Sequence, residues 1–393
     1  MSVHADPALG IAWTQDGWSA LLRGDPRHAE QCLGTALELT SDPELCRIAE
    51  LGLLEARDLH VELTGRRRGR ELPPKIYETP RLNLLGRQVL RACVYELGYR
   101  ARRAPEIEDD EALHARRLHE DGMVVLPDFF PPEVFAALRE EFARLLTHPE
   151  ARVLGAGPVR LRELPLPLGR AILAPAIGRH LTHNPRIRAI VATAGRRRAL
   201  PRPICCIQRA YARRSIDEPY DEPYGDGESD PETKLHSDHY INVFKAFFHL
   251  SETDVHTAFR YAPWTHRLSL GTLLYRYRTG RLRWLQQQGR ASEIPSDEYR
   301  EGRIVPSKRV LRLAGVHETA LAVAPNTLVI ANTRGFHRRS ELAPSSVRDT
   351  IRLDFREMER QVPLRVWAHR ALDPLRRLRS SWTDQIADSF LRR

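Results

Sequence analysis

The sequence predicts a mainly β protein with helices: an antiparallel sandwich or jelly-roll core, preceded by an α-helical region and followed by a helical tail. Two changes of pattern along the 393 residues predict this fold class. Between residues 14 and 104, apolar residues recur at helical spacing and strand signals are nearly absent. From about residue 200 to 357, short β-rich stretches alternate with Pro, Gly and acidic loops, as in a sandwich or jelly roll.

The first expected unit, residues 1–108, is helical. Turns that combine an Asp or Ser cap with a Pro are expected at residues 24–26 and 41–43, where one helix would end and the next begin. Residues 18–39 resemble one tetratricopeptide helix pair. No clear second copy follows, so we expect an ordinary helical appendage.

The second expected unit, residues 109–365, carries the β core. It opens with a short strand at residues 122–130 and a helix whose apolar face suits packing on a sheet. Further strands are expected at residues 204–207, 240–250, 320–324, 327–331 and 347–355. An acidic loop at 217–232 and a helical insertion at about 275–303 depart from a minimal jelly roll. Residues 366–393 are expected to form the closing helical tail.

Composition restricts the class of protein. The five cysteines are odd in number and lack framework spacing, which argues against a disulfide scaffold and fits a reducing cytoplasm. The sequence shows no signal-peptide pattern and no run of about 18 apolar residues, so we expect neither secretion nor a membrane span. The net charge of +10 could recruit nucleic acid, an acidic carrier or a phosphorylated substrate, although a coding bias toward Arg explains it more simply.

One constellation carries chemistry: His236 and Asp238, followed much later by His337. In a strand, alternate side chains share a face, so residues i and i+2 can reach one metal ion. His337 follows another apolar strand and can supply the third ligand. Two imidazoles and one carboxylate leave three coordination positions open, which non-haem iron(II) needs to bind a bidentate co-substrate and dioxygen.

A His-x-acid pair alone is a weak signal, because the chain has others. Examples are His60/Glu62, His119/Asp121 and His148/Glu150. The first lies in a helical stretch, where i and i+2 point apart, and the other two precede a strand or follow a helix end. Only His236/Asp238 combines a strand setting with a later histidine at another strand end. Any one of these histidines, taken singly, is more simply a hydrogen-bonded surface or core residue, whereas the assembled trio favours a metal site.

Four segments occur in an order that resembles the phytanoyl-CoA dioxygenase family of iron(II)/2-oxoglutarate oxygenases. They are HEDGMVVLPDFFPPEVFAALREEF, LHSDHY, FKAFFHLSETDVHTAFRYAPWTHRLS and NTRGFHRRS. The resemblance covers about residues 113–357. It implies a double-stranded β-helix (jelly roll, cupin-like) core, iron(II) as the metal, and 2-oxoglutarate and O2 as co-substrates.

The resemblance also points to an arginine for the distal carboxylate of 2-oxoglutarate. Arg348 stands eleven residues after His337, at the family spacing. In a strand over 347–355 its side chain would share a face with Arg352, opposite the apolar residues. A guanidinium holds a carboxylate with two parallel hydrogen bonds. Arg352 is the alternative, and either residue could instead be a surface arginine.

Further candidates are less specific. Gln208, Lys245 and Thr333 are candidates for co-substrate binding, and so is Arg339, although each could be structural. Trp264 and His266 could line the substrate pocket. Here the family turn that usually reads Pro-Gly-Ser-His is PWTH, and a Gly is lost at Ala258, so this loop is expected to follow a different path.

The sequence therefore predicts a dioxygenase that oxidises, and most simply hydroxylates, a C–H bond of a small molecule. Family halogenases lack the carboxylate that Asp238 retains, so halogenation is not expected. The substrate could be anionic or carrier-linked and belong to specialised metabolism; the co-products would be succinate and CO2. Two alternatives stay open: an oxygenase acting on nucleic acid or protein, and a non-catalytic jelly-roll binding protein. Nucleic acid is the weaker option, because aromatic residues are not interleaved with the Arg runs.

Overall fold

The computed structural model describes most of the chain between residues 7 and 356. The described residues are 7–22, 25–68, 86–107, 109–167, 173–197, 200, 202–213, 218–223, 230–295, 298–300 and 303–356. The expected tail at 366–393 lies outside these ranges. Among the described residues, no helix is long and apolar enough to cross a bilayer.

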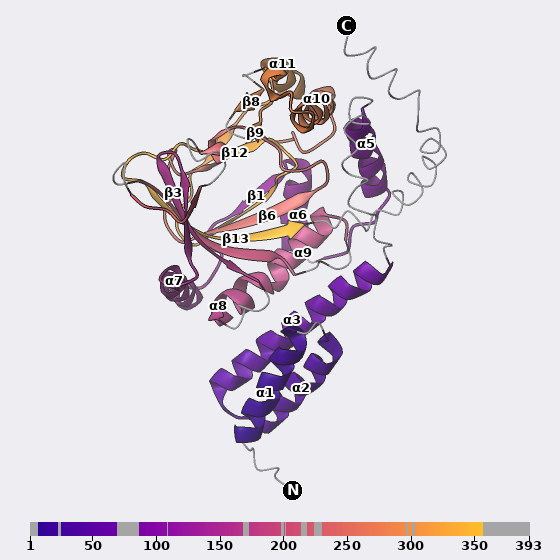
Figure 1. The fold of residues 1–393 in the computed structure, drawn as a ribbon. Helices are drawn as coiled ribbons and strands as arrows, with labels where there is room; N and C mark the ends of the chain where they lie inside the picture. The colour runs from indigo at the N-terminus through magenta and orange to yellow at the C-terminus, as the bar shows by residue number, and fades with distance from the viewer. Residues whose placement is uncertain are drawn as a thin grey trace.

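Three helices form the N-terminal region: α1 (Pro7–Leu22), α2 (Pro26–Leu39) and α3 (Pro43–Arg68). Each packs on the other two, and they enclose a small apolar core that includes Trp18 and Leu33. Asp25 caps α2 by accepting a hydrogen bond from the His28 amide at 3.2 Å, with Pro26 in the first turn as the sequence predicts. Figure 1 shows these helices as a separate layer below the β-rich part.

A buried ion cluster joins this helical layer to the rest of the molecule. Glu55 of α3 is completely buried, and its carboxylate lies 3.2 Å from His183 Nε2 and 2.5 Å from Arg202 Nε. Burial opposes ionisation of Glu55, but contacts with these two residues hold its pKa below the usual value. The cluster therefore anchors α3 beside the helices that cover the main sheet.

The core contains an eight-stranded sheet in the order β1-β11-β6-β13-β4-β3-β2-β5. Its strands are β1 (Met123–Leu126), β2 (Arg152–Ala156), β3 (Val159–Leu166), β4 (Ile204–Ala212), β5 (Glu222–Pro223), β6 (Val243–His249), β11 (Thr327–Asn332) and β13 (Val347–Arg356). All neighbours are antiparallel except β2 and β5. A three-stranded sheet, β10-β7-β12, is formed by β7 (Phe259–Tyr261), β10 (Thr319–Leu321) and β12 (His337–Arg339).

The two faces of the main sheet have different partners. Helices α6 (Asp109–Glu120), α7 (Pro132–Leu146), α8 (Pro175–Ile177) and α9 (Pro185–Ala194) contribute to the large apolar core on one face. Alternate residues of β6 and β13, such as Phe248 and Ile351, point into that core. On the other face Phe247 packs on Phe259 of the small sheet, with ring centroids 5.0 Å apart. This two-sheet arrangement with N-terminal helices confirms the predicted jelly-roll fold class.

Several element boundaries differ from the sequence prediction. The helical insertion begins earlier, because Ser269 and Thr272 form a capping box that starts α10 (Leu270–Gln287). After α10 come a 3₁₀ turn (Ala291–Glu293), two short strands, β8 (Tyr299–Arg300) and β9 (Arg303–Ile304), and α11 (Lys308–Ala314). A further helix, α5 (Arg87–Arg100), packs on α10. The strands expected at 240–250 and 320–324 are shorter, as β6 and β10.

Candidate metal centre

The two histidines of the predicted triad are held together by main-chain pairing. His236 and His337 form an isolated antiparallel bridge, with N–O distances of 3.0 and 2.9 Å. His337 opens β12, whereas His236 follows the 3₁₀ turn Pro231–Thr233 and has only this one bridge. His236 was expected to lie in a strand, but in the structure it forms only this one bridged pair outside the named strands. Asp238 is fixed separately, because its amide donates to the Thr333 carbonyl oxygen at 3.0 Å.

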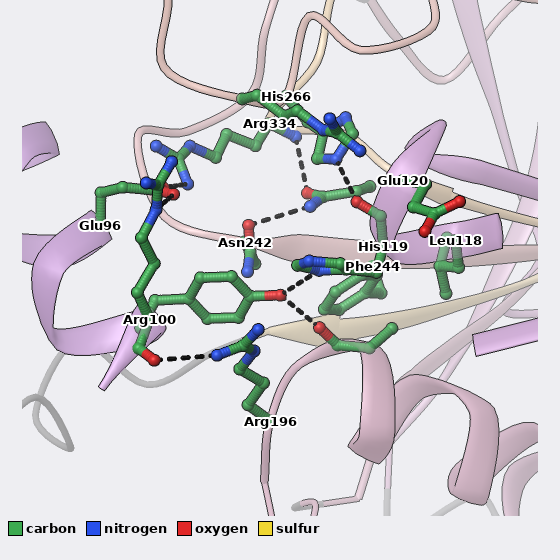
Figure 2. A pocket seen from close by; sticks show the side chains of 14 residues that line it. Glu96, Arg100, Leu118, His119, Glu120, Arg196, Asn242, Phe244, His266 and Arg334 are labelled. Carbon is green, nitrogen blue, oxygen red and sulfur yellow. Dashed lines mark hydrogen bonds and ion pairs between the residues drawn. The ribbon is translucent and has the colours of Figure 1, made fainter. Parts of the chain in front are cut away.

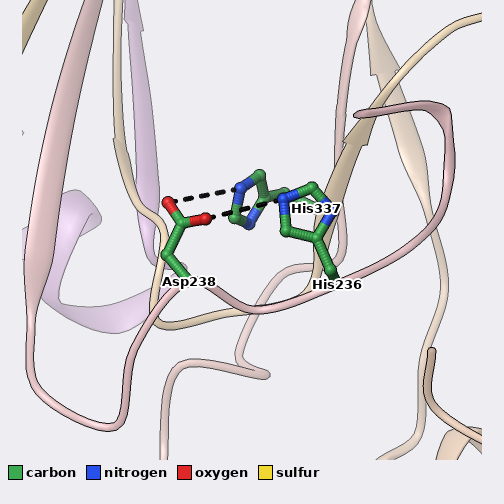
Figure 3. Close-up of side chains that lie close together, drawn as sticks. All are labelled: His236, Asp238 and His337. Atoms are coloured by element: carbon green, nitrogen blue, oxygen red, sulfur yellow. Dashed lines mark ion pairs between the residues drawn. The ribbon is translucent and has the colours of Figure 1, made fainter. Parts of the chain in front are cut away.

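Hydrogen bonds fix which ring nitrogens face the site. The Nδ1 atoms of His236 and His337 lie 2.7 and 3.0 Å from the carbonyl oxygens of Lys234 and Gly335. A carbonyl oxygen only accepts, so each Nδ1 donates its hydrogen there, and Nε2 is the nitrogen that each ring presents to a metal ion. These Nε2 atoms lie 3.5 and 3.6 Å from the Asp238 carboxylate oxygens, as Figure 3 shows.

The donor set fits a divalent transition metal. The three potential ligand atoms all lie within 4.8 Å of one another. The Nε2 of His236 is buried and has no hydrogen-bond partner among the described residues. Burial lowers the pKa of His337 to about 4, so its imidazole is neutral at pH 7. Two imidazoles and one carboxylate are the ligands of the non-haem iron(II) facial triad.

Two further charged residues lie next to the ligands, Lys245 beside Asp238 and Glu232 beside His236. Lys245 Nζ on β6 lies 2.7 Å from Asp238 Oδ2. Burial opposes ionisation of Asp238, yet His337, His236 and Lys245 hold its pKa well below the usual value. Glu232 Oε2 lies 3.6 Å from His236 Nε2, a second carboxylate that the sequence analysis missed. The only signal for Glu232 in the sequence was its position, four residues before His236 and at the end of an acidic loop.

The arginines between the two sheets differ in their partners. Arg352 Nε lies 3.1 Å from Asp354, which is 2% exposed. Arg339 of β12 is paired with Asp230 through two nitrogens, with Nε at 3.0 Å. Both guanidinium charges are therefore matched by carboxylates from this chain.

Arg348 stands apart from these two. Its Nη1 donates to the Thr257 carbonyl oxygen at 3.3 Å, and its Nε is buried without a hydrogen-bond partner among the described residues. None of those residues forms an ion pair with it. Burial, reinforced by Arg339, lowers the pKa of Arg348 to about 9. Among the described residues, Arg348 thus lacks the carboxylate partner that Arg352 and Arg339 have.

His249 lies beside Arg348 and was not identified from the sequence. It is 1% exposed, faces the same side of β6 as Lys245, and is paired in register with Thr350 of β13. Both ring nitrogens are buried without a hydrogen-bond partner among the described residues. Burial and the Arg348 charge lower its pKa to about 3. No motif marks this residue, so only the strand register could reveal it.

Comparison with known proteins gives a distant likeness. No family model and no curated protein matches the chain. Many solved structures match the chain, and three of them serve as examples. The non-haem α-ketoglutarate-dependent epimerase SnoN from nogalamycin biosynthesis has 16% identity and a TM-score of 0.41, over 63% of this chain and 83% of SnoN. EctD from S. alaskensis with 2-oxoglutarate and 5-hydroxyectoine has 13% identity and a TM-score of 0.40, over 66% and 84%. HygX from Streptomyces hygroscopicus with nickel and 2-oxoglutarate has 14% identity and a TM-score of 0.35, over 65% and 89%. At these identities the likeness concerns the fold alone.

Two of the other predicted residues make internal hydrogen bonds. The Thr333 side chain is fully buried, and its hydroxyl donates to the Val243 carbonyl oxygen at 3.1 Å. Its own carbonyl oxygen accepts from the Asp238 amide, so Thr333 fixes the position of a ligand residue. The Gln208 amide donates to Glu163 at 3.0 Å, on the sheet face that it shares with Thr350.

The structure does not bring Trp264 and His266 to the three ligands. Trp264 has φ +63°, is 57% exposed, and its indole nitrogen donates to Asp121 at 3.0 Å. His266 is buried, lies 2.9 Å from the His119 carbonyl oxygen, and lines a cavity that none of the three ligand residues lines. The PWTH turn packs on the end of α6, which directs both side chains there.

Proposed function

We propose that this chain is an iron(II)- and 2-oxoglutarate-dependent oxygenase that hydroxylates a C–H bond of a small-molecule substrate. One observation carries the proposal: His236, Asp238 and His337 converge between the two sheets, and the face of the main sheet that carries Lys245 also carries Arg348, whose buried Nε has no partner and which forms no ion pair among the described residues. The order of sequence motifs adds support for a phytanoyl-CoA dioxygenase-like assignment.

The chain's own residues would hold the metal through a fixed geometry. The two Nε2 atoms and one Asp238 oxygen are the ligands, and the Nδ1 hydrogen bonds to Lys234 and Gly335 keep the rings oriented. When bound, iron, 2-oxoglutarate and O2 supply the oxidising power that inserts one oxygen atom into a C–H bond, with succinate and CO2 as co-products. Lys245 keeps the Asp238 carboxylate ionised and oriented.

Arg348 and His249 would bind the distal carboxylate of 2-oxoglutarate. The unpartnered Nε of Arg348 and a ring nitrogen of His249 are donors in a buried, low-dielectric space. A carboxylate there would neutralise the Arg348 charge and accept hydrogen bonds from both side chains. This removes the cost of burying donors that lack partners. Arg352 and Arg339 already have carboxylate partners and would not compete.

The proposal is tested by anaerobic titration of the full-length protein with iron(II) and 2-oxoglutarate, followed by visible absorption of the iron–2-oxoglutarate chelate. The charge-transfer band should form with wild-type protein and be lost in His236→Ala and His337→Ala. Arg338→Gln is a matched control, because Arg338 faces the opposite side of β12 from His337 and pairs with Glu318. Folded wild-type protein that forms no band would overturn the proposal and favour a non-catalytic binding protein.

A further inference from the structure

A cavity of about 480 Å³ lies on the helix-covered side of the main sheet. Its walls come from α5, α6, α9 and the ends of β6 and β11. Phe244, labelled in Figure 2, lines it from β6, and Asn332 lines it from β11. Lys245 beside Asp238 faces the opposite side of β6, because successive residues of a strand alternate. The sheet therefore separates this cavity from the metal ligands.

The cavity has an excess of positive charge. Four arginines and two glutamates line it. Glu96 is paired with Arg100 and Arg334, each at 2.9 Å. Arg196 donates to the Arg100 carbonyl oxygen at 2.8 Å, and neither it nor Arg267 forms an ion pair with a described residue. In Figure 2 the carboxylate of Glu120, the second acidic residue, points away from the labelled arginines.

The histidines of the cavity respond to this charge. Burial is the main cause that lowers the pKa of His266, to about 4, and the positive charges of Arg334 and Arg267 add to it. Burial also lowers the pKa of His119, with contributions from Arg196 and Arg267. Both imidazoles are thus neutral at pH 7, so the net charge of the cavity comes from its arginines.

Arg334 supplies a donor with capacity for a ligand. It is 4% exposed, its guanidinium lies 5.2 Å from the Tyr95 ring centroid, and its Nη1 contacts Glu96. Its Nη2 is buried and has no hydrogen-bond partner in the described part of the chain. A buried guanidinium nitrogen without a partner is costly, and an oxyanion is the ligand that satisfies it. We propose that this cavity binds a small molecule through a carboxylate or phosphate group.

The same segment connects the cavity to the metal ligands. The Arg334 carbonyl oxygen accepts from Ser237 Oγ at 2.6 Å, and Ser237 stands between His236 and Asp238. The preceding Thr333 carbonyl oxygen accepts from the Asp238 amide at 3.0 Å. An anion bound to Arg334 restrains residues 333–334, and with them the HxD segment. Occupancy of the cavity and order at the metal centre are therefore thermodynamically coupled.

Isothermal titration calorimetry at constant ionic strength tests the binding site, with inorganic phosphate and citrate as separate probes and the full-length protein in the cell. At least one probe should bind saturably, and the two arms distinguish a phosphate from a carboxylate site. The double variant Arg196→Gln/Arg267→Gln should weaken binding at least about tenfold, because hydrogen bonds to charged groups contribute that much. The double variant Arg309→Gln/Arg312→Gln removes two exposed charges on α11 and should leave binding unchanged.

Three outcomes would overturn the site: no saturable binding of either probe, an equal loss in the α11 control, or loss of binding in Arg348→Gln, which would relocate the anion to the space between the sheets. Hydrogen exchange tests the coupling without requiring metal. The saturating probe should slow exchange of the Asp238 amide in wild-type protein and not in the cavity variant. Unchanged exchange at full occupancy would refute the coupling. None of these measurements depends on oxygenase activity, so they can fail independently of the proposed function.

Discussion

Arg348 and Arg352 make a matched pair for the sharpest prediction, because both lie on the same face of β13 and differ in their partners. The perturbation is Arg→Gln at each position, measured on metal-free and co-substrate-free protein by denaturant unfolding. Arg348 has a pKa lowered to about 9 in the folded state, so its charge destabilises the folded protein at pH values below 9. Arg348→Gln should therefore raise the free energy of unfolding at pH 7, by about 1 kcal/mol.

Arg352→Gln should have the opposite effect on stability. Arg352 lies 3.1 Å from Asp354, a carboxylate that is 2% exposed. Removal of one partner from a buried ion pair typically costs about 3 kcal/mol or more. Arg348 and Arg352 lie four residues apart on the same strand. The same substitution should change stability in opposite directions at the two positions, because only the Arg352 guanidinium is paired with a carboxylate.

The affinity for 2-oxoglutarate provides a second test of Arg348. A bidentate arginine–carboxylate contact that is lost in Arg348→Gln should cost roughly 3 kcal/mol, which is about a 150-fold weaker Kd. The assay is the anaerobic charge-transfer titration, with Arg352→Gln compared at a temperature where it stays folded. If Arg348→Gln destabilises the apo protein and binds 2-oxoglutarate normally, both the pKa argument and the assignment of the carboxylate site are refuted.

Three further predictions concern residues around the site. His249→Phe keeps the ring volume but removes both nitrogens, so 2-oxoglutarate affinity should fall about tenfold while iron binding is retained, as measured by the same titration. An unchanged affinity would exclude His249 from the carboxylate site. Thr333→Val removes the hydroxyl bonded to Val243 and should lower stability by about 1 kcal/mol, and a large loss of 2-oxoglutarate affinity would instead support a co-substrate role. Glu55→Gln should destabilise the protein at pH 7, and the difference from wild type should shrink in unfolding curves as pH falls below about 4.5, because the folded-state pKa of Glu55 lies below its ordinary value. A pH-independent difference would mean that Glu55 acts by packing alone.

The sequence by itself determined the features that depend on local pattern. The helical period before residue 104 and the alternation in residues 347–355 predicted the N-terminal helices and the two faces of β13, since period follows from backbone geometry alone. The capping box at Ser269 was an available local signal for the start of α10 that the prediction did not use. The three ligand candidates could be selected because one expected strand follows His236 and Asp238 and another precedes His337.

Tertiary structure alone decided which polar groups have partners. Arg339 meets Asp230, which lies 109 residues away in sequence, and Arg348 meets no carboxylate among the described residues. His249 acquires significance only because β6 pairs with β13 in a register that brings it near Arg348. Ion pairing and burial are set by residues far apart in the chain, so a single sequence holds no spacing that encodes them. The triad that the sequence predicted is one such case, completed only when β12 brings His337 to His236.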